Sequence, residues 1–186
     1  KIPAGVVSNE IVQHHDWLPT FLAMAGAPAV VEKLKKGYRA NGRTYKNHID
    51  GFSLLGHITG KEKESPRKVF FYISDDGDIM AIRYQNWKIT FMEQRCQGTL
   101  QIWLEPMVRL RGPKFYNLRT DPYEFADVTS NRYFDWSFQH GYLMYGAQAA
   151  AAAFAATFKD FPPIQKPNTF TLDDAIAKMS EPHAAG

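Results

Sequence analysis

The densest group of side chains able to do chemistry is formed by His14, His15 and Asp16. An imidazole titrates near neutral pH and a neighbouring carboxylate can orient it, so the three residues offer a general base or metal ligands. We expect residues 10–14 to form a short strand, in which successive side chains point to opposite faces, so His14 and His15 would not share one metal ion. Asp16 precedes an apolar stretch and is expected to cap a helix.

Acidic side chains stand in two predicted turns: Asp75, Asp76, Asp78, Asp121 and Glu124. The first three surround Gly77, and carboxylate oxygens are ligands of the kind that Ca²⁺ takes. An EF-hand loop also needs a glutamate at its twelfth position, which is Asn86 or Trp87 here. Since Asp-Gly is a hairpin signal and Asp121 stands before a proline, ordinary turns explain both groups.

Cys96 is the only cysteine, and its use as a nucleophile needs a base that only the fold could bring to it, His48 or His140. An inert, partly buried thiol is the alternative.

The tryptophans could provide stacking faces for sugars or bases: Trp17, Trp87, Trp103 and Trp136. Their spacing on predicted strands and helices is more typical of a core. From the residues alone we predict no catalytic, cofactor-binding or metal-binding residue.

Composition limits the classes that remain. The 186 residues are 45% hydrophobic and 22% charged, which is typical of a soluble globular domain and not of a disordered chain. A net charge of +3 without a long basic run does not favour a nucleic-acid partner. We expect no membrane span, because no apolar run approaches about 20 residues. The chain begins at Lys1 rather than at methionine, which we interpret as the middle of a longer polypeptide.

The first part of the chain is expected to be helical with one irregular surface excursion. Apolar spacing and end signals predict helices over residues 17–25 and 53–59. Between them, glycines interrupt residues 31–47, which carry most of the basic side chains of this part: Lys33, Lys35, Lys36, Arg39, Arg43 and Lys46. Residues 61–68 are expected to form a charged linker.

The second part is expected to be an antiparallel sheet followed by a long helix. Strand periodicity appears in four stretches: 69–73, 79–84, 87–92 and 114–118. Residues 93–112 are expected to be mainly a loop. Helical spacing covers residues 130–158, and a short last helix is expected from residue 171.

Several short motifs occur in one order along the chain: Lys-Ile-Pro-Ala-Gly (1–5), Asp-Trp-Leu-Pro-Thr (16–20), Ile-Asp-Gly (49–51), Ala-Ile-Arg (81–83), Trp-Lys (87–88) and Asn-Leu-Arg-Thr-Asp-Pro-Tyr-Glu (117–124). This ordered set resembles the carboxy-terminal third of arylsulfatases, in the alkaline-phosphatase-like superfamily. Residues 118–124 are the most specific part. The resemblance implies an α+β fold, in which a four-stranded antiparallel sheet packs against a long carboxy-terminal helix. Residues 1–66 would be the last elements of an α/β sulfatase domain, and residues 67–186 a carboxy-terminal subdomain.

The resemblance also implies where the chemistry lies. Such sulfatases oxidise the first residue of Cys/Ser-x-Pro-x-Arg to formylglycine and hold a calcium ion beside it. Here Cys96 is followed at the needed positions by Gly98 and Leu100, and the motif starting at Ser180 ends in Ala184. The chain is therefore expected to be a non-catalytic fragment without cofactors, whose partner is a missing amino-terminal catalytic domain that supplies formylglycine and calcium. Apolar faces left exposed by that domain would favour self-association.

Two other hypotheses remain open from the sequence. The chain could be an independent binding module that holds an anionic or carbohydrate ligand with its aromatic strands and the basic residues from Lys33 to Lys46. It could also be the same region of a related phosphodiesterase, which the upstream motif would distinguish.

Overall fold

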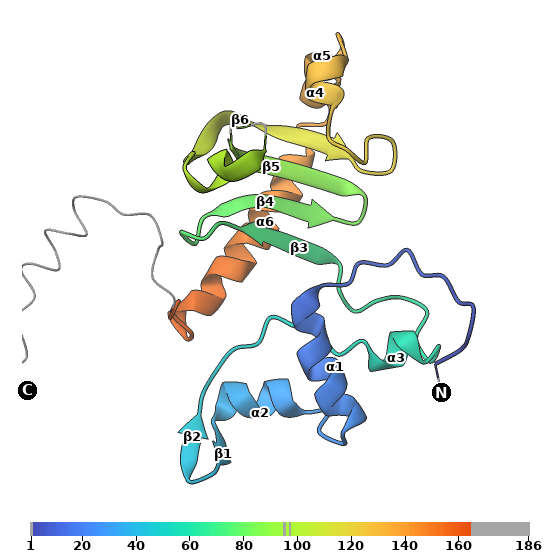
Figure 1. Ribbon diagram of the computed structural model, residues 1–186, viewed down its shortest axis with the longest axis vertical. Coiled ribbons are helices and arrows are strands. Elements are labelled where there is room, and N and C mark those ends of the chain that lie inside the picture. Colours follow the sequence, from blue (N-terminus) through green and yellow to red (C-terminus); the bar gives the residue numbers. More distant parts are fainter. Residues whose placement is uncertain (1, 95, 97, 165–186) are drawn as a thin grey trace, which may run out of the picture.

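The computed structural model describes residues 2–94, 96 and 98–164 (Figure 1). The first part of the chain contains short elements: η1 (His14–Asp16), α1 (Trp17–Met24), α2 (Val30–Lys36), β1 (Tyr38–Ala40), β2 (Arg43–Tyr45) and α3 (Leu55–Ile58). The second part contains the main sheet and its helices: β3 (Val69–Ile73), β4 (Ile79–Tyr84), β5 (Trp87–Gln94), η2 (Thr99–Trp103), β6 (Met107–Asn117), α4 (Ala126–Thr129), α5 (Tyr133–Gln139), α6 (Leu143–Ala156) and η3 (Thr157–Lys159).

The core lies between the four-stranded antiparallel sheet, in the order β3-β4-β5-β6, and α6. Cross-strand pairing places Phe71 opposite Ile82, Ile82 opposite Ile89, and Ile89 opposite Phe115, so one row of apolar side chains crosses all four strands. Helix α6 covers this row with small side chains, of which Ala147 is buried in the core. The predicted α+β fold with an antiparallel sheet and a carboxy-terminal helix is confirmed.

The helix predicted over residues 130–158 is wrong in one respect, because the structure divides it into α5 and α6. At the end of α5 the Nδ1 atom of His140 lies 2.7 Å from the carbonyl oxygen of Trp136. The amide of Gly141 then donates to the carbonyl of Phe138, which closes a turn in place of a continuing helical bond. The helical hydrogen-bond pattern of α5 therefore ends at the amide of Gly141, where the apolar spacing alone predicts continuation.

Two loops predicted from the sequence contain regular structure. Strand β6 begins at Met107, inside the predicted loop 93–112, and its pairing with β5 changes register between Thr90 and Met92. That irregularity breaks the alternation by which a strand is recognised. The excursion over residues 31–47 contains α2 and the β1–β2 hairpin; its glycines end the helix at Gly37 and form the hairpin turn at Gly42, both at positive φ.

Two further predicted elements concern the start and the end of the chain. Residues 10–13, predicted as part of a strand, form no regular element, and His14 and His15 lie in η1. The helix predicted from residue 171 lies outside the described residues.

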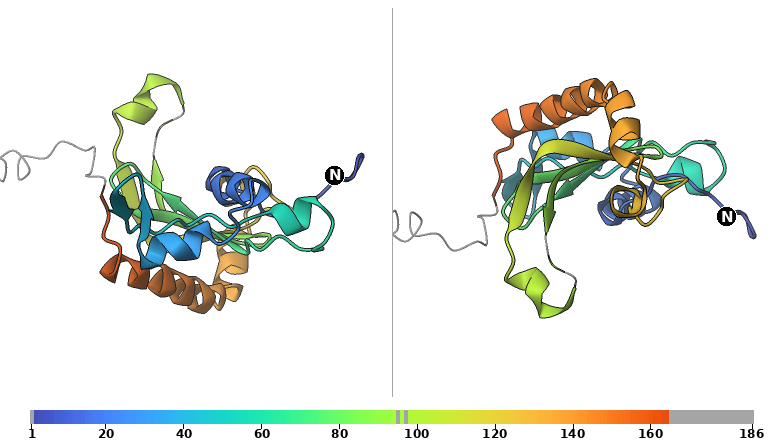
Figure 2. Two further views of the ribbon diagram at one scale, coloured as in Figure 1. Left: turned by 90° about the horizontal axis from the view of Figure 1, so that it is seen from below. Right: turned by 90° about the horizontal axis from the view of Figure 1, so that it is seen from above.

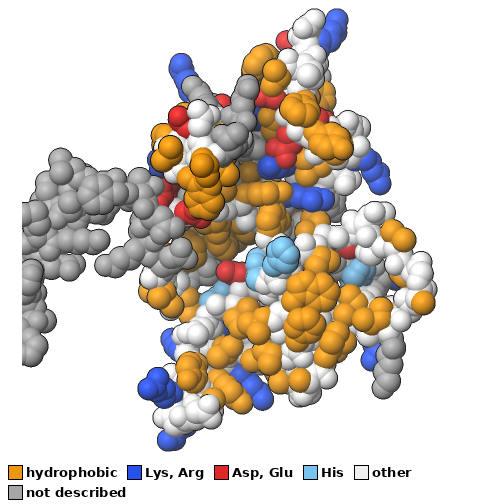
Figure 3. Space-filling model, in the orientation of Figure 1, with side chains coloured by type: hydrophobic (Ala, Val, Ile, Leu, Met, Phe, Trp, Pro, Cys, Tyr) orange, Lys and Arg blue, Asp and Glu red, His pale blue; other side chains and the backbone are white. Residues whose placement is uncertain are grey.

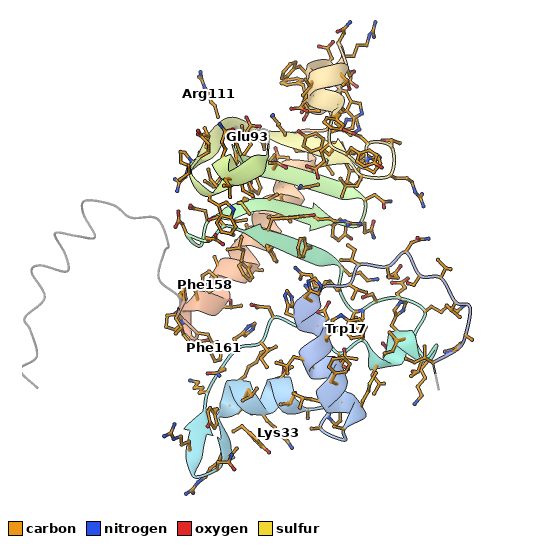
Figure 4. All side chains as sticks on the ribbon, in the orientation of Figure 1. Trp17, Lys33, Glu93, Arg111, Phe158 and Phe161 are labelled. Atoms are coloured by element: carbon orange, nitrogen blue, oxygen red, sulfur yellow. The ribbon has the colours of Figure 1, made fainter. Side chains whose placement is uncertain are left out.

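Among the described residues, the two parts of the chain contact each other just before β3 and again after α6. Arg67, just before β3, forms a buried ion pair with Asp16 at the start of α1. After α6, the ring of Phe161 packs against His48 at 5.4 Å between ring centroids, and the Nζ atom of Lys46 lies 5.8 Å from the centre of the same ring (Figure 4). Seen along the sheet, α6 lies on one side and α1 on the other (Figure 2).

Candidate functional site

A buried ion pair joins Asp16 to Arg67. The Nη2 and Nε atoms of Arg67 lie 2.5 Å and 2.7 Å from the two carboxylate oxygens of Asp16, so the guanidinium binds the carboxylate with two parallel bonds. The side chain of Arg67 is 5% exposed and that of Asp16 is 0% exposed. Arg67 also donates to the backbone carbonyls of Asp50 and Val69. This one side chain therefore links α1, the segment before α3 and the start of β3.

The carboxylate of Asp16 does not cap α1 as predicted. It accepts hydrogen bonds from the amides of Gln13 and Phe52, at 2.9 Å each, in addition to those from Arg67. Burial by itself raises the pKa of Asp16, but these hydrogen bonds outweigh burial and hold the pKa below its ordinary value. Asp16 is therefore a charged structural anchor that satisfies four donors.

His15 contacts the same anchor from its exposed side. Its Nε2 atom lies 2.7 Å from Nη2 of Arg67, so a neutral imidazole accepts a hydrogen bond there. Desolvation first, and the positive charge of Arg67 second, lower the pKa of His15 below 6.5. The sequence cluster of His14, His15 and Asp16 is thus divided, because only His15 and Asp16 contact Arg67.

The outer face of α1 is apolar. Four large side chains on this helix are at least 38% exposed: Trp17, Leu18, Phe21 and Met24. The rings of Trp17 and Phe21 stack at 5.6 Å, because residues four apart share a helix face. Hydrophobic side chains gather over α1 in Figure 3, and Trp17 is marked in Figure 4. The opposite face of the helix is buried through Thr20 and Ala23. A helix that is apolar on its exposed face is suited to contact another protein surface.

A second concave site lies at the other end of the sheet, beside β6. We call it the α5 cavity; its volume is about 520 Å³ and it is lined chiefly by Trp87, Asn117, Ser130, Arg132, Trp136 and His140. Of the four tryptophans singled out in the sequence, the structure brings together Trp87 and Trp136, whose rings lie 6.0 Å apart and nearly parallel. Trp17 lies on α1 and Trp103 in η2.

Three of the acidic side chains in the predicted turns, Asp78, Asp121 and Glu124, form hydrogen bonds or ion pairs within the fold. Asp78 pairs with Arg109 at 3.2 Å beside the β3–β4 turn. The carboxylate of Asp121 accepts hydrogen bonds from the amides of Phe125 and Ala126 at the start of α4. Glu124 binds the Nζ atom of Lys88 on β5, at 2.6 Å for its closer oxygen.

The other candidates remain apart. Cys96 is a half-buried free thiol, and among the described residues neither His48 nor His140 forms a hydrogen bond with it. Within residues 2–94, 96 and 98–164, no three His, Cys, Asp or Glu side chains are grouped closely enough to hold a metal ion. The described residues therefore do not fit a calcium site, and we assign no step through calcium to them.

Of the basic residues in the predicted excursion, three lie on α2 (Lys33, Lys35 and Lys36), Arg39 and Arg43 lie on the β1–β2 hairpin, and Lys46 follows it. Lys35 pairs with Glu32, and Lys33 lies over the ring of Tyr38.

The sequence analysis does not identify Arg67 as a functional residue, because it places Arg67 in a charged linker. A basic residue next to a strand start is a common feature, and no local pattern indicates its buried partner 51 positions earlier.

Comparison with known proteins places most of the chain in one group. Residues 65–185 match the family model described as the C-terminal region of aryl-sulfatase. Among solved structures, the chain is similar to the crystal structure of PsFucS1 sulfatase from Pseudoalteromonas sp., with 26% sequence identity and a TM-score of 0.48. That match covers 62% of this chain and 22% of the sulfatase chain. No curated protein matches. In the part of the chain that the structure describes, no helix is long and apolar enough to cross a membrane.

Proposed function

The chain belongs to the family of aryl-sulfatase C-terminal regions, and we propose that it is the non-catalytic carboxy-terminal portion of a protein that hydrolyses sulfate esters. The family match over residues 65–185 carries the proposal. A sulfate ester hydrolase must stabilise negative charge on the transferred sulfate with convergent positive groups. Among the described residues, the positive charge of the buried Arg67 is already neutralised by Asp16. The catalytic groups, including formylglycine and calcium, would then belong to a preceding portion of the complete protein.

We further propose how the two parts divide. Residues 1–66 would complete the catalytic domain, and residues 67–186 would form the carboxy-terminal subdomain. The exposed apolar face of α1 supports this division, because a helix at the edge of a larger α/β domain buries such a face against neighbouring elements. The ion pair of Asp16 with Arg67 would then fix the subdomain to the catalytic domain.

The coding sequence upstream of Lys1 tests the proposal. We expect it to encode Cys or Ser followed by x-Pro-x-Arg, and a Trp-Pro-Gly turn shortly before Lys1. An upstream region without the nucleophile motif would overturn the sulfatase assignment and favour the related phosphodiesterase.

A further inference from the structure

We propose that the α5 cavity binds a sugar acid, a hydroxyl-bearing ring with one carboxylate. The lining of the cavity includes residues of β6. Helix α1 lies near β3, at the opposite edge of the sheet (Figure 1). The cavity is therefore separate from the apolar face of α1, and the inference does not depend on the proposed sulfatase function.

The wall of the cavity is aromatic and rigid. The ring of Trp136 lies 6.0 Å from that of Trp87 and 4.4 Å from that of His140. Behind them, Tyr133 is only 3% exposed, and its hydroxyl accepts from the amide of Phe115 and donates to the carbonyl of the same residue. A preformed wall of this kind loses little conformational freedom on binding, and its ring faces suit the apolar C–H groups of a sugar ring.

Three side chains of the lining offer hydrogen-bond donors to a ligand: Arg132, Ser130 and Asn117. Among the described residues, the guanidinium of the exposed Arg132 forms no hydrogen bond or ion pair; its backbone amide donates to Oγ of Ser130. The hydroxyl hydrogen of Ser130 therefore stays available. Asn117 uses its Oδ1 atom to accept from the amide of Arg119, which leaves its NH₂ group. The carboxylate of Asp121 already accepts two backbone amides.

The donors of Arg132, Asn117 and Ser130 favour a ligand that has both a carboxylate and hydroxyl groups. The forked guanidinium of Arg132 matches a carboxylate with two parallel bonds. The NH₂ of Asn117 and the hydroxyl of Ser130 match ring hydroxyls. A flat apolar anion such as benzoate would leave those donors without partners, and a neutral sugar would leave the guanidinium unpaired, so each should bind less tightly. The cavity volume of about 520 Å³ lies within the range of about 300–1,000 Å³ usual for small-molecule sites.

The test is a titration of the full chain with D-glucuronate, D-glucose and benzoate, followed by tryptophan fluorescence and by the indole N–H signals in NMR spectra. We expect glucuronate to bind most tightly and to shift the signals of Trp87 and Trp136. Arg132→Gln should weaken glucuronate binding about tenfold or more, since it removes a charged partner. Arg111→Gln, on the exposed part of β6 and outside the cavity lining, is the matched control and should leave binding unchanged.

Three results would overturn the inference. They are the absence of glucuronate binding, equal binding of glucose or benzoate, and an Arg132→Gln variant that binds glucuronate as the unmodified chain does. Thermal unfolding of both variants checks that each is folded; we expect no loss, because the described side chain of Arg132 makes no contact that holds the fold.

Discussion

The ion pair of Asp16 and Arg67 is the residue-scale feature on which the contact between the two parts depends. Replacement of Arg67 by Met leaves the Asp16 carboxylate buried without its charged partner, and such a change costs about 3–5 kcal/mol of unfolding free energy. Urea unfolding measures this cost. Arg109→Met is the matched control, because the pair of Arg109 with Asp78 is exposed and should contribute at most about 1 kcal/mol. Equal effects of the two substitutions would contradict the anchoring role of Arg67.

His15 makes the stability of the chain depend on pH. Its pKa in the folded state is lowered, so the unfolded state binds a proton more readily as the pH falls below about 6.5. Protonation therefore draws the equilibrium toward unfolding, and we expect the unfolding free energy to decrease between about pH 7 and pH 5.

The control for this dependence is the neighbouring histidine. His15→Gln should reduce the slope of unfolding free energy against pH in this window, whereas His14→Gln, in the same turn but without contact to Arg67, should keep the slope. An unchanged slope in His15→Gln would show that other groups cause the dependence.

The sequence indicates two residues of the anchor, His15 and Asp16, but does not indicate their partner Arg67. His15 and Asp16 stood out because their types and adjacency suggest chemistry. Their partner Arg67 is 51 positions from Asp16, and the backbone amide of Phe52 is 36 positions away, so neither contact leaves a local pattern. Only the packing of α1 against the start of β3 brings these groups together.

At the scale of elements, Gly51 marks the closest approach of two segments. A Cβ atom at this position would lie 2.1 Å from the carbonyl oxygen of His15, so Gly51→Ala must displace backbone at the anchor. We expect it to lower the unfolding temperature. Gly146→Ala is the matched control, since its Cβ would meet nothing within 4 Å and alanine favours a helix interior by about 1 kcal/mol. It should raise the unfolding temperature, and a loss of stability equal to that of Gly51→Ala would contradict this interpretation.

The elements could be predicted where one periodicity dominates. Strands β3, β4 and β5 alternate apolar residues toward α6 and turn at Asp-Gly and at Gln85 and Asn86, so their positions follow from the sequence. Strand β6 changes register against β5, and the helical bonds of α5 end at the turn that Gly141 closes. Such local departures from a period depend on tertiary contacts, which no single window of sequence contains.

At the scale of the whole molecule, the apolar face of α1 should control association of the isolated chain. Phe21 lies near the middle of this face and is 58% exposed. A charge at this position opposes burial of the face against a second surface. We expect Phe21→Glu to lower self-association in sedimentation equilibrium. Phe138→Glu places the same charge on α5, where Phe138 is 89% exposed, and should have less effect. The opposite order would place the association surface beside α5.

We propose that this chain is the carboxy-terminal portion of a sulfatase and that the catalytic groups lie in a preceding portion. Hydrolysis of 4-nitrophenyl sulfate tests it most directly, with the purified chain and the complete protein measured at equal concentration. We predict turnover by the complete protein and none by the chain. Turnover by the chain alone, retained after gel filtration, would contradict the claim.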